Sequence, residues 1–379
     1  MKQIQKNRLK KLRNSVYKSL NLVFILTFSI VIILLLFLTT IFKDSLEYSI
    51  NGYYRFDSIK QDDMTVYYLD VGQGDCSFIK FHNNQTMLID SGTKESVDNL
   101  VKILVDYIYK DKPLIIDYVL LTHSDMDHSG GLLDIMNIFQ VNNIFRPRIF
   151  DTYNGETIDI ERDNSLNEKN CIDNSYYHSL INSFYLEPNC NVYFTDKDSC
   201  NEFFDEKNLD VKFYFPSKDF YSSVTNEYSP IFNISYKGQN FLFTGDTNDD
   251  IEKQVCNNED LPNVTFLKVA HHGSKYGTSK ELLNEVKPQN AIISVGANTY
   301  GHPTWNVINR LDDIGSNVYR TDKLGNIIIN VGNEGTNIKN TIIDRFYVNI
   351  GYFNIGIIYY FIYAIYANIK EKYLFNNVI

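Results

Sequence analysis

The stretch from Thr122 to Gly131 reads Thr-His-Ser-Asp-Met-Asp-His-Ser-Gly-Gly and carries four side chains that bind metals in proteins. The apolar run 115–121 before it predicts a buried strand, and the two glycines after it predict the opening of a helix. An Asx turn with helix N-caps explains one of the aspartates but not two histidines as well. The sequence therefore predicts a metal-binding loop at a strand end, with four ligands: His123, Asp125, Asp127 and His128.

Two further histidine-bearing segments also follow predicted strands. His271-His272-Gly-Ser comes directly after the strand predicted at 266–270, and His302 lies in a Gly-His-Pro turn beyond 291–295. Five of the seven histidines therefore fall in three loops, which random placement does not explain. Asp246 follows the apolar run 240–244. A lone Gly-Asp is usually a turn, so the case for Asp246 depends on the other ligands.

Apolar periodicity outlines one folded domain, residues 64–345, within an α/β fold class. Short runs at 64–70, 76–81 and 86–90 predict an antiparallel meander of strands, and a helix is predicted over 97–109. The polar, weakly periodic stretch at about 151–208 is interpreted as an insertion. Strands resume at 211–215, 231–236, 240–244, 266–270 and 291–295, with helices after the later ones. Two series of strands and helices predict a four-layer αββα sandwich with active-site loops along one sheet edge.

Charge is distributed unevenly along the 379 residues. The first 18 residues hold seven basic side chains and no acidic one, so residues 19–379 carry 29 basic against 46 acidic side chains. A protein that coats nucleic acid is therefore not expected, because Lys and Arg supply most of the affinity for phosphate. Any polyanionic substrate needs a local cation. The five cysteines form no CxxC pair, which argues against a zinc ribbon or a dense disulfide framework.

Residues 20–42 form an uncharged, apolar run. As a helix this run is roughly 34 Å long at ~1.5 Å per residue, enough to cross a ~30 Å hydrocarbon core. It is too long for the apolar region of a signal peptide, and residues 39–43 offer no small-x-small cleavage site. We expect an uncleaved transmembrane anchor in the cell membrane. The basic tail, residues 1–19, then stays in the cytoplasm, and the domain 64–345 is extracytoplasmic.

A second uncharged run, residues 350–369, allows two interpretations. It is just long enough to form a second transmembrane helix, in which case both ends of the chain are cytoplasmic. Its asparagines and tyrosines equally suit an interfacial or buried helix that closes the domain.

The order of these motifs resembles the metallo-β-lactamase superfamily, specifically the hydrolase domain of ComEC-type DNA-uptake competence proteins. The resemblance covers residues 64–332. Its five motifs are Asp90-Ser-Gly, His123-x-Asp-x-Asp-His, Gly245-Asp246, His271-His-Gly-Ser and Gly301-His-Pro. Leu69–Asp75, Leu-Asp-Val-Gly-Gln-Gly-Asp, is similar to the opening motif of the competence subgroup. The resemblance implies a metal-dependent hydrolase in which Asp90 mainly organises the loops.

Three departures limit what the resemblance implies. Asp125 stands where most members of the superfamily have a second histidine, as it does in the competence-type subgroup, and the greater oxygen content admits Mn²⁺ as well as Zn²⁺. The histidine expected before Asp246 is missing, and Asn226-Glu-Tyr-Ser229 resembles the Asn-x-x-Ser of the subgroup instead. A full competence channel has many transmembrane helices, and this chain has one or two apolar runs. DNA transport is therefore not implied.

The resemblance also implies a site with two divalent ions, Zn²⁺ or Mn²⁺. His123 and Asp125 would hold one ion and Asp127 and His128 the other, with Asp246 bridging and His271 completing the shell. His272 is an alternative to His271, because adjacent side chains point differently. His302 either contacts a phosphate oxygen, protonates the leaving group or fixes its turn. Lys275 is either a phosphate contact or a solvated residue at a helix start. The catalytic candidates are Asp127, Asp246 and His302.

We therefore expect a membrane-anchored phosphodiesterase or nuclease that uses a water activated by two metals. The expected partners are the membrane and a phosphodiester substrate, with DNA as one candidate. A β-lactamase or lactonase is the enzymatic alternative. A non-catalytic membrane accessory protein is the alternative from another class. Such a protein would carry a site that has lost its ligands, whereas ligands are present here at every motif but one, which argues against this alternative.

Overall fold

The computed structural model describes residues 4–12, 14–16, 19, 63–110, 112–149, 151–153, 156–158, 176–220, 222 and 224–341. It divides into two units, residues 1–54 and 55–379. Within the first unit, residues 4–12 and 14–16 are helical. The predicted transmembrane runs 20–42 and 350–369 lie outside the described residues. Over the residues that are described, no helix is both long enough and apolar enough to span a membrane.

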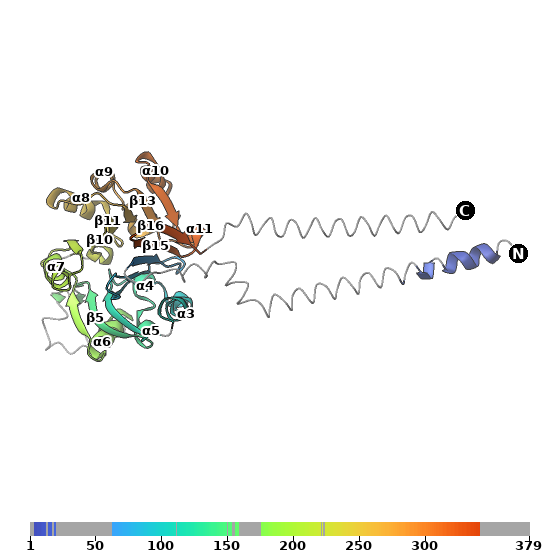
Figure 1. Cartoon of the computed structure of the whole chain (residues 1–379), viewed down its shortest axis with the longest axis horizontal. Helices are drawn as coiled ribbons and strands as arrows, with labels where there is room; N and C mark the ends of the chain where they lie inside the picture. The colour runs from blue at the N-terminus through green and yellow to red at the C-terminus, as the bar shows by residue number, and fades with distance from the viewer. Residues whose placement is uncertain are drawn as a thin grey trace. The chain divides into compact units, whose positions relative to one another are not determined.

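The second unit contains two large sheets (Figure 1). The first has eight strands in the order β16-β15-β1-β2-β3-β4-β5-β8. Its strands are β1 (Met64–Tyr68), β2 (Ser77–Lys80), β3 (Thr86–Ile89), β4 (Ile115–Leu120), β5 (Gln140–Arg146), β8 (Asn191–Phe194), β15 (Ile327–Gly332) and β16 (Gly335–Asn340). The predicted meander is confirmed, because β2 pairs antiparallel with both β1 and β3.

The second sheet has six strands in the order β14-β13-β12-β11-β10-β9. They are β9 (Val211–Phe215), β10 (Ile231–Tyr236), β11 (Gln239–Phe243), β12 (Phe266–Lys268), β13 (Asn290–Ile293) and β14 (Asn317–Arg320). Pairing is parallel from β11 to β14, and β3, β4, β5 and β8 are likewise parallel in the first sheet. A separate hairpin pairs β6 (Asp151–Tyr153) with β7 (Glu156–Ile158).

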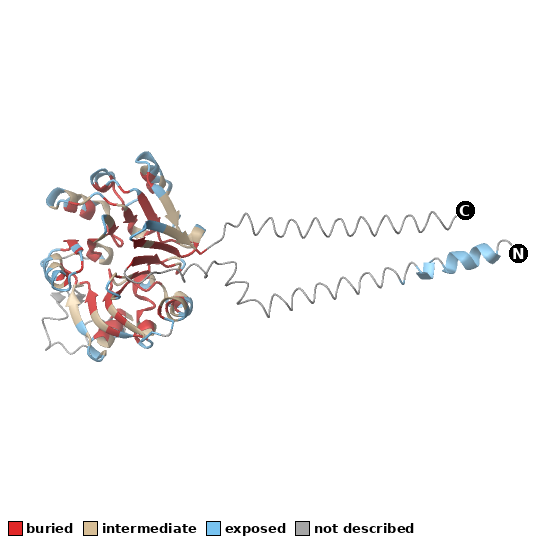
Figure 2. Cartoon of the chain, viewed as in Figure 1, coloured by how far each residue is buried: buried red, intermediate tan, exposed pale blue. Residues whose placement is uncertain are grey.

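The two sheets face each other across an aromatic core. Tyr68 of β1 stacks on Phe243 of β11 with ring centroids 6.0 Å apart, which joins the sheets directly. Phe232 stacks on Phe243, and Phe213 on Phe232. Residues on alternate positions point the other way: Tyr67 packs on Phe78, which contacts Tyr109 on the outer face. The central strands are therefore buried on both faces, as Figure 2 shows in red, whereas the edge strands β8, β14 and β16 are exposed or only partly buried.

Helices cover the outer faces and complete the four-layer sandwich that the sequence predicts. The second sheet is covered by α8 (Asp249–Asn258), α9 (Lys280–Val286) and α10 (Trp305–Asp313). On the side of the first sheet lie α3 (Val97–Ile103), its π-helical extension η3 (Leu104–Tyr109), α4 (Met126–Ser129) and α5 (Leu132–Met136). The remaining short helices are η2 (Lys94–Ser96), η5 (Thr225–Tyr228), η6 (Ala270–Gly273) and α11 (Thr321–Leu324).

Part of the segment interpreted as an insertion is built into the domain. Residues 176–206 form α6 (Tyr176–Leu186), β8 and α7 (Lys197–Glu206), and β8 extends the first sheet by pairing parallel with β5. Phe204 of α7 is buried in the core between the sheets. The sequence hides this role because β8 is a short strand at the sheet edge whose residues are only partly buried, so its hydrophobic pattern is weak.

Candidate metal centre

The candidate ligands lie in loops at the carboxyl ends of strands from both sheets. His123 follows β4 of the first sheet, and Asp246 follows β11 of the second. The two histidines of the His-His-Gly-Ser motif follow β12, next to β11. Because parallel strands end at the same edge, residues far apart in sequence meet there, which is where open α/β sheets generally bind ligands.

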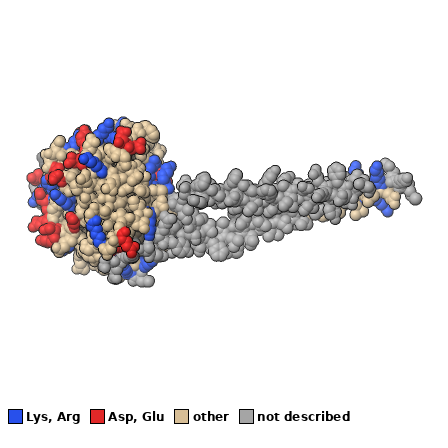
Figure 3. Space-filling view, turned by 45° about the horizontal axis from the view of Figure 1, so that its top comes forward, with Lys and Arg blue, Asp and Glu red and all other residues tan. Residues whose placement is uncertain are grey.

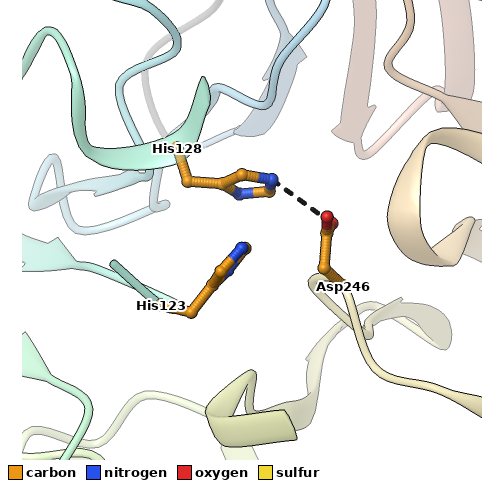
Figure 4. Close-up of side chains that lie close together, drawn as sticks. All are labelled: His123, His128 and Asp246. Carbon is orange, nitrogen blue, oxygen red and sulfur yellow. Dashed lines mark ion pairs between the residues drawn. The ribbon is translucent and has the colours of Figure 1, made fainter. Parts of the chain in front are cut away.

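One group of ligand atoms comes from His123, His128 and Asp246. One atom from each lies within 4.8 Å of the other two, and all three residues are buried. His128 Nε2 is 3.3 Å from Asp246 Oδ1, and Figure 4 shows both histidine rings turned toward the carboxylate. Two imidazoles and a carboxylate at this spacing form a donor set that Zn²⁺ and other divalent ions accept.

A second group comes from Asp127, His128 and His272, again within 4.8 Å. His272 Nε2 lies 3.2 Å from Asp127 Oδ2 and 3.7 Å from Asp246 Oδ2. His271 Nε2 is also 3.7 Å from Asp246 Oδ2, although its side chain is 37% exposed. The structure thus brings both adjacent histidines to Asp246, where the sequence analysis places His271 in the shell with His272 as the alternative. Both have left-handed backbone angles, with φ of 47° and 52°.

The buried nitrogens fit metal coordination. His128 Nδ1 lies 2.7 Å from Asp90 Oδ2, and His272 Nδ1 lies 2.9 Å from the carbonyl oxygen of Ser294. Both partners accept hydrogen bonds, so each Nδ1 donates its proton away from the site and each Nε2 is the nitrogen that faces the carboxylates and could bind a metal. Within this first ligand group, three buried side-chain atoms have no hydrogen-bond partner among the described residues: His123 Nε2, His128 Nε2 and Asp246 Oδ1. Such unpaired buried atoms are costly, and a divalent cation would satisfy all three.

Asp90 organises the first loop, as the resemblance implies. Its carboxylate accepts hydrogen bonds from the backbone N–H and the hydroxyl of Thr122, at 2.8 and 2.7 Å, as well as from His128. The Thr122 hydroxyl oxygen in turn lies 2.9 Å from His123 Nδ1. Burial raises the pKa of Asp90, while the His128 interaction and the Thr122 N–H favour its charged form. One buried carboxylate thereby orients two candidate ligands.

The segment before Asp246 supports the site with hydroxyl groups. Thr225 Oγ1 donates to Asp125 Oδ1 at 2.8 Å, and Asp125 Oδ2 lies 3.8 Å from His123 Nε2. Ser229 Oγ accepts from the backbone N–H of Asp246 at 3.0 Å and lies 3.3 Å from His123 Nδ1. Ser229 belongs to the Asn-x-x-Ser stretch found in place of the missing histidine. The sequence does not predict this role of Thr225, because a threonine in a polar loop belongs to no metal-binding motif.

The loop of the opening motif, Leu69–Asp75, contacts the backbone of Asp127. The backbone N–H of Asp75 donates to the Asp127 carbonyl oxygen at 3.0 Å. Gly74 has no room for a side chain, because a Cβ there would lie 2.5 Å from that same oxygen. Lys268 Nζ of β12 lies 2.6 Å from Asp75 Oδ2, and both side chains are buried. This buried ion pair ties the loop from the first sheet to the second.

The electrostatics of the buried groups favour cation binding. Burial raises the pKa of Asp246, but His128 and His272 outweigh it and hold the pKa well below its usual range. Burial also acts against ionisation of Asp127, yet the contacts with His272 and His128 lower its pKa to about 2. Burial, aided by His128, lowers the pKa of His123 to about 3. Asp246, Asp127 and His123 are therefore in the forms that bind metals at neutral pH. Burial opposes the charged forms of His128 and His272, but Asp246 and the other nearby carboxylates outweigh it and raise the pKa of both histidines, so each must release a proton when a metal binds.

His302 and Lys275 lie on the loops next to these groups. The His302 ring centroid is 5.5 Å from that of His271, and its buried Nδ1 has no hydrogen-bond partner among the described residues. Burial, then repulsion from His271, lowers its pKa. Asn298 fixes its backbone by bonding both its N–H and its carbonyl oxygen. Lys275 is exposed, with Nζ 4.7 Å from the centroid of the Tyr276 ring.

Comparison with known proteins agrees with this geometry. A family model described as the metallo-beta-lactamase superfamily matches residues 69–170. ComE operon protein 3 of Bacillus subtilis is 26% identical over 275 residues, 68% of this chain and 32% of that protein. Competence protein ComA of Neisseria gonorrhoeae is 24% identical over 296 residues, 78% of this chain and 36% of that protein. The chain thus spans about a third of the length of these relatives.

Among solved structures, the metallo-beta-lactamase fold protein YhfI from Bacillus subtilis aligns with a TM-score of 0.42 at 12% identity, covering 71% of this chain and 99% of that one. The conclusion rests on the family match, on the competence relatives and on the ligand groups at the strand ends. Together they support a metallo-β-lactamase hydrolase that resembles the ComEC-type competence proteins.

Proposed function

We propose that the chain is a membrane-anchored, metal-dependent phosphodiesterase that takes two divalent ions. One observation carries the proposal: two groups of His and Asp ligand atoms share His128 and meet at the buried carboxylate of Asp246. Two ions held side by side suit a phosphodiester, because the attacking and leaving oxygens both need stabilisation. The competence relatives favour this chemistry over β-lactam opening.

The ligands divide between the two ions as follows. His123 and Asp125 would hold the first ion, and Asp127, His128 and His272 would hold the second. Asp246 would contribute to both sites, and His271 lies near Asp246 on the more exposed side. The bound ions supply Lewis acidity to the substrate oxygens and lower the pKa of water. We propose Zn²⁺ or Mn²⁺ as the bound ions, because imidazole ligands favour Zn²⁺ and carboxylate ligands favour Mn²⁺.

The surrounding residues orient the ligands and handle a proton. Asp90, Thr122 and Ser229 hold the two histidines of the first loop and the backbone of Asp246. His302 is neutral at pH 7, because its pKa lies below the ordinary value. A neutral imidazole carries one proton on a ring nitrogen. It can therefore donate a hydrogen bond to a phosphate oxygen or deliver the proton to the leaving oxygen.

The charge distribution supports local rather than extended binding of the substrate. The chain carries a net charge of −10, and on the face in Figure 3 acidic and basic side chains are interspersed. Cations at the ligand groups would attract a single phosphate, so the protein would need no basic surface around the site. Nucleic acid, DNA in particular, is the substrate we favour. Participation in DNA uptake is a further step of the proposal, supported by the names of the relatives.

Residues 20–42 provide the membrane anchor in this proposal, and the domain 64–345 faces outward. The seven basic side chains before residue 20 support this orientation by the positive-inside rule. Residues 350–369 either add a second span or form an interfacial or buried helix that closes the domain. Protease treatment of intact cells should digest the domain. Protection in intact cells with digestion in inside-out vesicles would reverse the orientation.

The function is tested with the purified full chain. Metal analysis after dialysis should give about two divalent ions per chain. A substrate panel should include a chromogenic phosphodiester, single-stranded DNA, a β-lactam and a lactone, each with Zn²⁺ and with Mn²⁺. We expect turnover of the phosphodiester. Efficient β-lactam or lactone turnover without phosphodiester cleavage would replace the assigned substrate, and no turnover of any kind together with no bound metal would favour an accessory protein.

A further inference from the structure

Several exposed hydrophobic side chains lie on the chain segments that carry the candidate ligands. Over the described part of the folded domain, residues 63–341 with their gaps, nine large hydrophobic side chains are exposed. Five of them lie on segments that carry the candidate ligands or their hydrogen-bonding partners: Met126, Val224, Tyr276, Tyr300 and Trp305. Single exposed apolar residues need no explanation, but five on the segments that carry a candidate site favour a binding surface there. We name Tyr276, Tyr300 and Trp305 the aromatic rim; they are 65%, 75% and 74% exposed.

The aromatic rim is connected to the ligand groups by short contacts. The Tyr300 ring centroid lies 5.9 Å from that of His302, which lies 5.5 Å from that of His271. His271 in turn reaches Asp246. Trp305 begins α10, and the preceding residue, Thr304, donates its N–H and its hydroxyl to the carbonyl oxygen of Gly273. A molecule with its reacting group at Asp246 therefore has Tyr300 within reach through His271 and His302, and Trp305 on the segment bonded to the His-His-Gly-Ser loop.

The backbone that carries the rim is fixed by hydrogen bonds. Tyr276 accepts at its carbonyl oxygen from the N–H of Asp249 at 2.7 Å. The guanidinium of Arg310 donates to the carbonyl oxygens of Lys275 and Gly277 at 3.3 and 3.0 Å. Asn298 bonds the backbone of His302, two residues after Tyr300. Ordered loops that hold aromatic rings in water are preorganised for a ligand, since little further ordering is needed on binding.

We propose that the aromatic rim is a binding subsite for the nucleobases of a single-stranded nucleic acid whose phosphate is held at the metal centre. The proposal rests on the phosphodiesterase function above for the position of the phosphate. Flat apolar rings attached to an anionic backbone match exposed aromatic side chains next to a cation site. Lys275, with Nζ over the Tyr276 ring, adds a positive charge at the same place. Bases in a duplex are already stacked on each other, so the subsite selects unpaired strands of any sequence.

The single tryptophan of the chain reports on the subsite directly. The purified full chain is titrated with a phosphorothioate thymidine oligonucleotide of about 12 residues, within the ~4–16 nucleotides typical of stacking sites. An abasic oligonucleotide of the same length and linkage is titrated in parallel. We expect saturable quenching of Trp305 fluorescence by the first and much weaker binding of the second. Equal affinity for both oligonucleotides would overturn the proposal, because it would show that the bases are not contacted.

A matched pair of variants locates the contact. Tyr300→Ala should raise the Kd for the thymidine oligonucleotide by about 5- to 150-fold, the range that corresponds to about 1–3 kcal/mol per stacked base. Tyr185→Ala removes a tyrosine that is 57% exposed on α6, outside the rim, and should leave this Kd unchanged. Equal effects of the two substitutions would overturn the proposal.

Two outcomes separate this subsite from the proposed function. Base-dependent quenching without cleavage of any phosphodiester would uphold the subsite and contradict the phosphodiesterase. Cleavage of a chromogenic phosphodiester with base-independent binding would do the reverse. Anionic lipid vesicles form a third arm, because exposed aromatic residues also occur at membrane surfaces. A Trp305 emission shift with vesicles, and none with oligonucleotides, would assign the rim to the membrane and overturn the proposal.

Discussion

Asp90 Oδ2 lies 2.7 Å from His128 Nδ1, and both side chains are buried. Asp90 belongs to neither ligand group, yet it decides which nitrogen of His128 keeps its proton when a metal binds. Because Nδ1 is held by Asp90, Nε2 is the nitrogen of His128 that faces Asp246 and could bind a metal.

Substitution Asp90→Asn should lower metal affinity by about 10- to 100-fold, the usual effect of removing a carboxylate behind a ligating histidine. The amide cannot accept from Thr122 and His128 as the carboxylate does. Zn²⁺ titration of the purified chain measures the change. Asp219→Asn, on the exposed surface, is the control. Unchanged Zn²⁺ affinity in Asp90→Asn would show that the contact does not organise the site.

The hydroxyl of Thr225 should matter through Asp125. Thr225→Val keeps the shape but removes the bond to Asp125 Oδ1, so the carboxylate is no longer directed toward His123. We expect one of the two ions to bind about tenfold more weakly, within the range for such supporting residues. Thr225→Ser retains the hydroxyl and should restore the affinity. A Thr225→Ser variant as impaired as Thr225→Val would assign the effect to packing instead.

Metal removal should destabilise the domain. The ligand groups contain buried atoms without hydrogen-bond partners, and a cation that binds only the folded chain stabilises it by mass action. Free metal at about a thousand times its Kd contributes about 4 kcal/mol. Thermal unfolding with Zn²⁺ and with a chelator measures the difference in Tm. The difference should vanish in Asp246→Ala, and an equally large difference in that variant would place the metal elsewhere.

Glu252 should make stability depend on pH. It is fully buried on α8, where its oxygens accept from the N–H groups of Thr278 and Ser279. Burial nevertheless raises its pKa from 4.5 to about 7. The pKa of Glu252 is higher in the folded state than in the unfolded state. Its contribution to the free energy of unfolding is therefore complete below pH 4.5 and is lost as pH rises through 7.

The loss amounts to up to about 3 kcal/mol at ~1.4 kcal/mol per pKa unit. Glu252→Gln cannot titrate. Its Tm relative to the unaltered chain should therefore rise between pH 4.5 and 7 when both are measured with chelator. Glu281→Gln, exposed on α9, should keep a constant difference. If the Tm of Glu252→Gln relative to the unaltered chain fell over this range, the pKa of Glu252 would be lowered, not raised, in the folded state.

The sandwich and the meeting of the His and Asp loops are predictable from the sequence because both depend on local patterns. Apolar runs locate β1 to β4, and each ligand follows such a run at a strand end. The helix predicted over 97–109 is present but changes to π-helical turns at Leu104, a local detail that apolar spacing does not encode.

The finer geometry depends on contacts between distant residues. The sequence does not predict which of His271 and His272 faces Asp246. Both do, because the two residues adopt left-handed backbone angles in succession. Thr225 approaches Asp125 from 100 positions away. The place of β8 at the edge of the first sheet likewise depends on tertiary pairing, because its four residues are too few to show a strand period.

The central claim is a metal-dependent phosphodiesterase whose ions meet at Asp246. The most direct measurement compares the unaltered chain with Asp246→Ala for hydrolysis of a chromogenic phosphodiester in Zn²⁺ and in Mn²⁺, with the bound metal counted in both. We predict turnover with about two ions bound in the unaltered chain. In Asp246→Ala we predict loss of metal and a rate lower by several orders of magnitude, the scale of removing a central electrostatic contact. Full activity in Asp246→Ala would contradict the account, because the chemistry would then lie elsewhere.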